Sequence, residues 1–139
     1  MKKTKNFFLK KKILVYGMGK SGVSTYNFLK KKANLYLFDD NQKINFKLNR
    51  KLIDYREIFK KEFDIIIISP GIDISHCKLS NFLKKNYQKI YTDLDVFYEF
   101  YKNDCITITG TNGKSTTCQL LFNVLSDHKL DVKLVGNIG

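Results

Sequence analysis

Hydrophobic residues occur along the chain in short runs, and polar segments with helical spacing separate these runs. Short apolar runs that end in glycine, proline or acidic residues are typical of buried strands. The pattern predicts strands over residues 12–17, 35–40, 63–71, 88–92, 104–110 and 129–136. It predicts helices over residues 19–32, 76–86, 93–103 and 115–127. Residues 41–62 are polar, and they allow either a weak strand or a short helix.

The alternation of strand and helix predicts βαβ units, which build a parallel sheet through right-handed crossovers. We therefore expect an α/β protein with a Rossmann-like N-terminal domain over residues 1–92. The pattern then starts again, and residues 93–139 are expected to begin a second, P-loop α/β domain. One strand, one helix and one strand cannot cover both faces of a parallel sheet, so we expect this second domain to be incomplete.

A glycine motif of the GxGxxG type follows the first predicted strand, with glycines at Gly17, Gly19 and Gly22. Glycines at such a junction let the backbone approach a pyrophosphate, and the helix N-terminus adds N–H donors and a positive dipole. Asp39 ends the second predicted strand, where dinucleotide-binding domains carry a ribose-binding carboxylate. The motif predicts a site for the diphosphate of a nucleotide, without specifying the nucleotide. A tight turn with no ligand is the structural alternative.

A second glycine motif, TGTNGKSTT, spans residues 109–117 and lies between an apolar run and a predicted helix. Small residues let successive N–H groups converge on phosphate oxygens. The lysine can bridge terminal phosphates, and the hydroxyl after it can ligate Mg²⁺. Gly110 lies closer to Gly113 than the pattern GxxxxGK[ST] requires, so the loop is a shorter variant of a P-loop. A glycine-rich turn with a capping hydroxyl is the alternative.

The composition excludes several classes of protein. With 139 residues, 43% of them hydrophobic, the chain can bury a core. No apolar run approaches the roughly 18 residues of a membrane span. Cys77, Cys105 and Cys118 show no CxxC spacing, which argues against a disulfide framework and a zinc site. The net charge is +12, but the lysines are dispersed along the sequence, which favours a compositional origin over a nucleic-acid or membrane surface.

The two glycine motifs together narrow the choice of function. A plain dehydrogenase has no use for an ATP-type loop, and a plain P-loop ATPase has no use for the front domain. The segment ITGTNGKSTT resembles the ATP-binding loop of the Mur ligases, the ATP-dependent amino-acid ligases of peptidoglycan synthesis. The segments YGMGKSGVS, LFDD, IIISPGID, TDLDVFYEF and VGNIG resemble the D-glutamate-adding branch of that family. The resemblance covers nearly the whole chain, but only the front part of the usual enzyme.

The resemblance implies roles for individual residues, and it implies that the first domain binds UDP rather than NAD. The implied substrate-binding residues are Gly19, Lys20, Ser21, Asp39, Asp40, Ser69, Pro70, Gly71 and Asn137. The implied ATP-binding residues are Gly110, Thr111, Asn112, Gly113, Lys114, Ser115 and Thr116. Lys114 is implied as the catalytic residue, and Ser115 is implied as a ligand of Mg²⁺.

The resemblance also implies the chemistry. ATP phosphorylates the carboxylate of UDP-N-acetylmuramoyl-L-alanine, and the amine of D-glutamate attacks the acyl phosphate. The implied enzyme is cytoplasmic and monomeric, with small-molecule partners, no nucleic acid and no membrane. We expect no ligase activity from this chain alone, because the resemblance places further metal-binding residues and a third domain beyond Gly139. The alternatives are an NAD-binding Rossmann oxidoreductase that uses Asp39 and a nucleotide-sensing module.

Overall fold

The structure, a computed structural model, describes residues 7–41 and 52–136 of the chain. It divides into two compact units, Met1–Lys102 and Asn103–Gly139. The division falls after the helix over residues 93–100 and not at the expected position near residue 92, because that helix packs on the first unit. The rings of Phe28 and Phe100, which lie 4.8 Å apart, are part of this packing.

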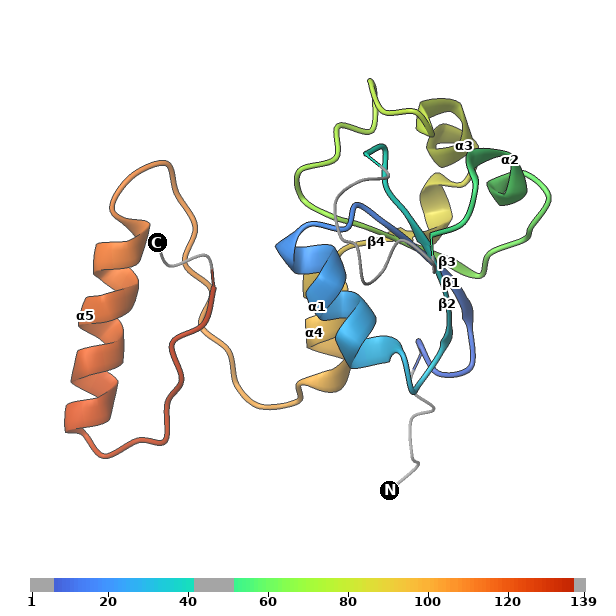
Figure 1. The fold of residues 1–139 in the computed structure, drawn as a ribbon. Coiled ribbons are helices and arrows are strands. Elements are labelled where there is room, and N and C mark those ends of the chain that lie inside the picture. The colour runs from blue at the N-terminus through green and yellow to red at the C-terminus, as the bar shows by residue number, and fades with distance from the viewer. Residues whose placement is uncertain (1–6, 42–51, 137–139) are drawn as a thin grey trace. The chain divides into compact units, whose positions relative to one another are not determined.

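A four-stranded parallel sheet forms the centre of the first unit (Figure 1). Its spatial order is β2-β1-β3-β4. The strands are β1 (Lys12–Tyr16), β2 (Asn34–Phe38), β3 (Ile65–Ile68) and β4 (Ile90–Tyr91). Tyr16 pairs with both Phe38 and Ile68, so β1, β2 and β3 end at the same level. After β1 the chain adds β2 on one side, and after β3 it adds β4 on the other side. The gap between the ends of β1 and β3 is therefore the switch point where open α/β sheets bind ligands.

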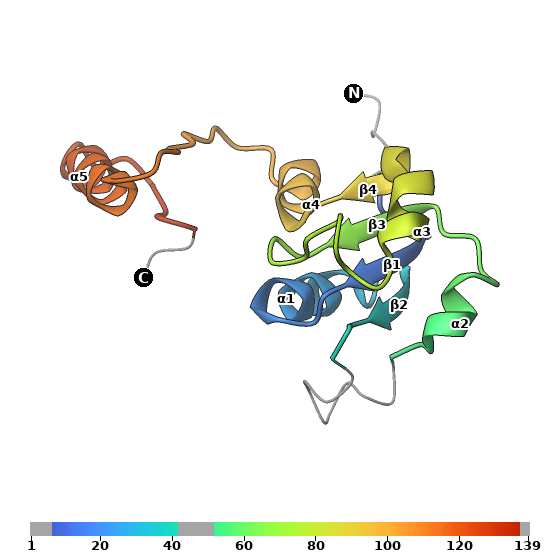
Figure 2. The same cartoon turned by 90° about the horizontal axis from the view of Figure 1, so that it is seen from above.

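Helices cover both faces of this sheet (Figure 2). The helices α1 (Lys20–Leu29) and α4 (Asp93–Phe100) lie on one face. The helices α2 (Tyr55–Ile58) and α3 (Ser80–Lys85) lie on the other. The predicted Rossmann-like α/β arrangement of the first domain is therefore confirmed.

The alternation of side chains along β1 builds the two cores. Ile13 and Val15 belong to the core shared with α1 and α4, whereas Leu14 and Tyr16 belong to the core shared with α2 and α3. All four residues are essentially inaccessible to solvent. Because both faces of the sheet are covered, its central strands are apolar throughout, as in the four isoleucines of β3.

Local hydrogen bonds fix several helix boundaries. Thr92 and Asp95 form a capping box at the start of α4. The Asp54 side chain accepts a hydrogen bond from the N–H of Arg56 and begins α2, the short helix that was one of two options for residues 41–62. Residues 42–51 of that segment lie outside the described residues. The predicted helix over 76–86 starts later, because Asp73 organises a turn by accepting the N–H groups of His76 and Cys77.

The second unit contains the helix α5 (Lys114–Asp127), as predicted. The strands predicted over 104–110 and 129–136 are not formed, and that prediction is wrong for the residues that the structure describes. A parallel strand needs neighbouring strands for its backbone groups and cover on both faces, and the described part of this unit provides neither. Ile106 and Val135 consequently remain 66% and 65% exposed, and α5 has no buried residue.

Among the residues that the structure describes, none of the helices combines the length and the apolar character needed to cross a bilayer.

Candidate functional site

Three loops meet at the carboxyl edge of the first unit's sheet. They are the glycine turn (residues 17–22) after β1, the residues that follow β2, and residues 69–79 after β3. They meet because β1, β2 and β3 are parallel and end at the same level. Gly17 and Ser69 lie on the two sides of the switch point between β1 and β3.

The glycine turn is held by contacts that only glycine permits. A Cβ atom on Gly22 would lie 1.8 Å from the carbonyl oxygen of Gly17, so the start of α1 lies directly against the end of β1. Gly17 has a φ of 91°, in the left-handed region that disfavours side chains. A Cβ there would lie 2.9 Å from the Cβ of Ser69. The close approach required by the sequence motif is therefore present.

Ser69 fixes the turn from the neighbouring strand. Its hydroxyl donates a 2.7 Å hydrogen bond to the carbonyl oxygen of Gly17. Its N–H donates to the carbonyl oxygen of Tyr16. Pro70 and Gly71 follow as the exposed part of the turn. Ser69 thus aligns the two strand ends, whereas Pro70 and Gly71 face solvent.

The open side of the glycine turn is the start of α1. Gly19 is the N-cap, with no side chain capping the helix and open space where a Cβ would be. The first N–H groups of a helix have no partner within the helix, so they can bind an anion. Lys20 is exposed and Ser21 is half-buried beside these N–H groups. The predicted phosphate-binding residues Gly19, Lys20 and Ser21 thus lie together at one accessible point.

Asp39 is 7% exposed, and its carboxylate is bonded to the backbone. One oxygen accepts the N–H of Met18 at 2.6 Å, and the other accepts the N–H of Asn41 at 2.8 Å. Asp39 therefore ties the glycine turn to the end of β2. Each oxygen keeps a further lone pair, so these bonds do not exclude another donor. The observed role of Asp39 is to position the turn, and a direct contact with ligand remains a prediction.

Asp40 joins the third loop to the same edge. Its Oδ1 accepts a 2.7 Å hydrogen bond from the hydroxyl of Tyr16. Its backbone oxygen accepts one of 2.7 Å from the Nζ of Lys78. Burial raises the pKa of Tyr16, and its hydrogen bonds with Asp40 and Cys77 raise that pKa further. The hydroxyl stays protonated and acts as a donor.

Sequence reasoning did not identify Tyr16 and Lys78 as part of this edge. A signal for Tyr16 was available, because a tyrosine inside an otherwise apolar strand needs a partner for its hydroxyl. The carboxylates after the next strand could supply that partner. For Lys78 no such signal exists, because it lies in a loop whose path depends on the folded β3.

An exposed ion pair lies further along the third loop. The Nδ1 of His76 is 2.7 Å from Oδ2 of Asp73. This hydrogen bond, together with one from the N–H of Ser75, lowers the pKa of the Asp73 carboxyl. His76 is accordingly a surface residue.

The second glycine loop (residues 109–117) lies in the other unit and has a looser geometry. Gly113 is the N-cap of α5 with a φ of 74°, and no side chain caps this helix. The Nζ of Lys114 donates to the carbonyl oxygens of Gly110 and Thr111, the latter at 3.0 Å. Thr111, Asn112, Ser115 and Thr116 are all exposed. The N–H groups at the start of α5 thus remain accessible while Lys114 is folded onto its own loop.

The predicted residues are therefore brought together in two groups. Gly19, Lys20, Ser21, Asp39, Asp40 and the turn over residues 69–71 share the carboxyl edge of the first unit. Residues 110–116 form the loop before α5 and the first residues of that helix, in the second unit. Asn137 lies outside the described residues. The part of the chain that the structure describes holds no cluster of three or more His, Cys, Asp or Glu side chains that could bind a metal ion.

Comparisons with known proteins identify relatives of this arrangement. The family model "Mur ligase MurD-like, N-terminal domain" matches residues 11–90. A UDP-N-acetylmuramoylalanine–D-glutamate ligase from Rickettsia bellii (strain RML369-C) is 37% identical, covering 94% of this chain and 30% of the relative. The protein of the same description from Aquifex aeolicus (strain VF5) is 38% identical, covering 92% of this chain and 29% of the relative. The chain thus spans about three tenths of these relatives.

Among solved structures, the chain is similar to a UDP-D-quinovosamine 4-dehydrogenase from Vibrio fischeri. It is 20% identical, with a TM-score of 0.40, and the match covers 60% of this chain and 75% of that protein.

Proposed function

Because the chain belongs to the Mur ligase family through its MurD-like N-terminal domain, we propose that it forms the nucleotide-sugar-binding part of an ATP-dependent ligase. The ligase would join D-glutamate to UDP-N-acetylmuramoyl-L-alanine in the cytoplasm, as a step of peptidoglycan synthesis. The two relatives that are UDP-N-acetylmuramoylalanine–D-glutamate ligases, at 37% and 38% identity over nearly the whole chain, support this substrate pair.

One observation carries the proposal: the family match over residues 11–90 contains the glycine turn at the switch point of the sheet. Gly22 packs against Gly17, so α1 begins directly at this edge. Because no side chain caps α1, its first N–H groups are accessible to a ligand. The diphosphate of the UDP group would accept hydrogen bonds from these N–H groups. Lys20 would add a positive charge on the same side.

The buried carboxylate of Asp39 bears on the alternative of an NAD-binding oxidoreductase. In dinucleotide-binding domains the acidic residue at this place binds the ribose hydroxyls. Here both of its oxygens accept backbone N–H groups, from Met18 and Asn41. Each oxygen keeps a further lone pair, so these bonds alone do not exclude a ribose contact. The low exposure of Asp39, 7%, favours a role in positioning the turn, and the titration with NADH described below distinguishes the two ligands.

The second glycine loop supports an ATP site by its type of donors. Lys114, the start of α5 and the hydroxyls of Ser115 and Thr116 together fit a polyphosphate. Binding would require the Nζ of Lys114 to exchange the carbonyl oxygens of Gly110 and Thr111 for phosphate oxygens. Ser115 would contribute one ligand to Mg²⁺, whose charge offsets that of the phosphates when it is bound.

Calorimetric titration of the full chain tests the first domain. We expect UDP-N-acetylmuramoyl-L-alanine to bind at least about tenfold more tightly than NADH. Lys20→Gln should weaken binding of the UDP compound by roughly fivefold, because it removes a charge-assisted contact. The matched control is Lys30→Gln at the opposite end of α1, which makes the same change in net charge and should leave the affinity unchanged. Tighter binding of NADH would favour the oxidoreductase.

A second measurement addresses catalysis by the chain itself. With ATP, Mg²⁺, D-glutamate and the UDP substrate all present, we expect no release of phosphate above background. The reason is that the chain spans about three tenths of its relatives. Phosphate release that depends on both D-glutamate and the UDP substrate would show that the chain suffices for the reaction.

A further inference from the structure

The fold gathers lysines that are dispersed along the sequence. In a parallel sheet with helical crossovers, the strands begin where the helices end, so both lie at one edge of the unit. We define the lysine edge as Lys10, Lys12, Lys31, Lys60 and Lys89, which are all exposed. Lys10 precedes β1, and Lys12 is its first residue. Lys31 follows α1, Lys60 follows α2, and Lys89 precedes β4. This edge is opposite the carboxyl edge that carries the glycine turn.

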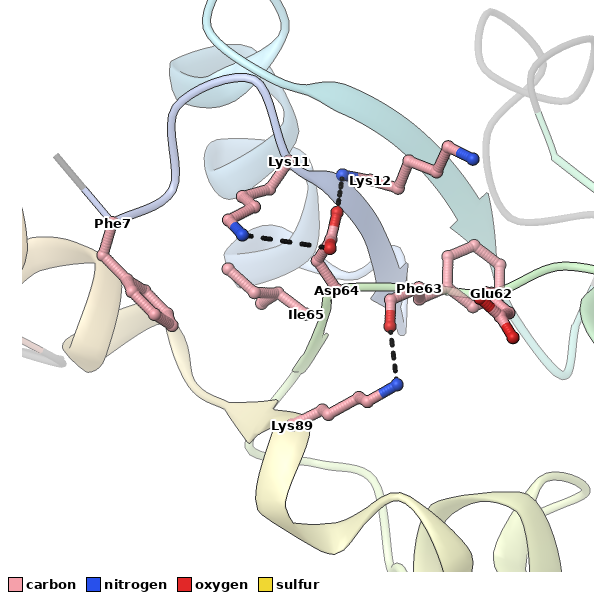
Figure 3. Close-up of a pocket in the computed structure, with 8 residues that line it drawn as sticks. All are labelled: Phe7, Lys11, Lys12, Glu62, Phe63, Asp64, Ile65 and Lys89. Carbon is pink, nitrogen blue, oxygen red and sulfur yellow. Dashed lines mark hydrogen bonds and ion pairs between the residues drawn. The ribbon is translucent and has the colours of Figure 1, made fainter. Parts of the chain in front are cut away.

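Hydrogen bonds show that the segments of Lys10, Lys12 and Lys89 meet their neighbours at this edge. The N–H of Lys10 donates to the carbonyl oxygen of Lys32 just after α1. The N–H of Lys12 donates to the carboxylate of Asp64 just before β3, at 2.8 Å. The Nζ of Lys89 donates to the carbonyl oxygen of Phe63 at 3.1 Å. Figure 3 shows Lys11, Lys12 and Lys89 around a pocket of about 360 Å³ that Phe7 and Asp64 also line.

Positive charge at this edge exceeds the carboxylates available to neutralise it. The Oδ1 of Asp64 lies 3.9 Å from the Nζ of Lys11, and Glu57 pairs with both Lys60 and Lys61. Glu62, which lines the same pocket, is a third carboxylate at this edge. Within the described part of the chain, Lys10, Lys12, Lys31 and Lys89 make no ion pair. The Nζ of Lys89 keeps further donors beside its bond to the Phe63 carbonyl oxygen, and the charge of all four ammonium groups is not neutralised by a carboxylate, so they can attract an external anion.

Exposed apolar side chains stand next to these lysines. Leu9, which is 40% exposed, directly precedes Lys10, and Phe7, which is 44% exposed, lines the same pocket as Lys11, Lys12 and Lys89. Phe59, at 52%, precedes Lys60, and Tyr87, at 68%, lies beside Lys89. A surface with both exposed lysines and protruding apolar side chains suits the boundary between lipid headgroups and acyl chains.

We propose that the lysine edge docks the protein onto an anionic lipid bilayer as a peripheral surface. Each lysine near such a membrane contributes through the negative potential of its lipids, and Leu9 and Phe59 would enter the interface. Phe7, Phe59 and Tyr87 could also stack on bases, so a single-stranded nucleic acid is the competing occupant. We favour a bilayer because lysine is a point charge without the bidentate geometry of arginine for phosphate, and because Leu9 adds an aliphatic side chain that has no ring to stack. This surface is independent of the nucleotide site and goes beyond the function proposed above.

Co-sedimentation of the full chain with sucrose-loaded vesicles tests the proposal. One set of vesicles is pure phosphatidylcholine, and in the other about one third of the lipid is phosphatidylglycerol. We expect binding to the anionic vesicles only. The double variant Lys10→Gln with Lys31→Gln should weaken that binding on the order of tenfold, given the contribution of each lysine near a charged surface.

A matched double variant controls for net charge. Lys129→Gln with Lys133→Gln removes the same charge from exposed positions of the second unit and should change vesicle binding by less than about twofold. Leu9→Ser should weaken vesicle binding without changing the binding of a single-stranded oligonucleotide.

Three results would overturn the proposal. They are equal binding to both kinds of vesicle, equal losses in the two double variants, and a loss of oligonucleotide binding in the Lys10 and Lys31 variant while its vesicle binding is unchanged. Circular dichroism of each variant confirms that it is folded before the comparison is made.

Discussion

The two glycine loops follow the same order of sequence, an apolar run, small residues and a helix, yet their structures differ. In the glycine turn the run is the central strand β1, and Gly17, Gly22 and Ser69 are packed against one another. In the second glycine loop the run is exposed coil, and a Cβ on Gly113 would meet no atom within 4 Å. A loop of this type becomes rigid through the neighbours of its strand, and its own residues are not sufficient.

The largest expected effect on stability comes from adding a methyl group at Gly22, where α1 contacts the end of β1. Gly22→Ala would bring a Cβ to 1.8 Å from the Gly17 carbonyl oxygen, so α1 and β1 must separate. We expect the free energy of unfolding of the first unit to fall by at least about 4 kcal/mol, measured by urea denaturation. Gly113→Ala should leave that unfolding transition unchanged, since its cost of roughly 1–2 kcal/mol is local to the other unit. A stable Gly22→Ala protein would contradict the close contact.

The second largest effect is expected from truncating an apolar side chain, and it should differ between the two units. Ile66 in β3 is fully buried, and Ile66→Ala should lower the free energy of unfolding by about 3 kcal/mol through lost packing and a cavity. Leu120 in α5 is 61% exposed, so Leu120→Ala should change it by less than about 0.5 kcal/mol. Equal effects in chemical denaturation would mean that α5 is buried in solution.

A smaller effect is expected from the bond that joins β1 to Asp40. Tyr16→Phe removes the hydroxyl that donates to Asp40 at 2.7 Å and leaves that carboxylate with one fewer donor. We expect a loss of about 1–2 kcal/mol in the free energy of unfolding. Tyr87→Phe is the control at a tyrosine that is 68% exposed, and it should be nearly neutral. The two variants must differ if the bond at the carboxyl edge stabilises the fold.

The smallest effect belongs to the exposed pair of Asp73 and His76. The hydrogen bond from His76 lowers the pKa of Asp73, so this contribution to stability is present above the ordinary carboxyl pKa and is lost as pH falls through the lowered value. His76→Asn should move the pKa of Asp73 back up, as an NMR titration of the side-chain carboxyl would show. An unchanged pKa would mean that the pair does not form in solution.

Much of the first unit was predictable, because its strands and its glycine turn follow from the spacing of apolar residues and glycines along the sequence. The apolar runs that became β1, β2 and β3 and the glycine spacing of residues 17–22 are local properties of the sequence. The predicted strands over 104–110 and 129–136 show the same local pattern but are not formed in the described residues. Periodicity records which residues suit a strand, whereas a strand exists only where neighbours satisfy its backbone.

The candidate site was predictable in its residue types but not in its connections. Gly19, Lys20 and Ser21 were identified from their spacing, and they share one accessible point. The bond from Ser69 to Gly17 joins two loops that are distant in the sequence, so no local pattern reveals it. The bond from Tyr16 to Asp40 is also non-local, and the sequence signalled only that the Tyr16 hydroxyl needs a partner. The same reason explains why dispersed lysines gave no sign of the surface that they form together.

The length of the strands separates the two edges of the first unit electrically. β1 has five residues, and at about 3.3 Å each it spans roughly 16 Å from the lysines at its start to the glycines at its end. At physiological ionic strength the field of an exposed charge decays over about 8 Å. The positive charge at the start of the strands therefore contributes little to attracting phosphates at their ends, and each edge can change its charge without altering the affinity of the other.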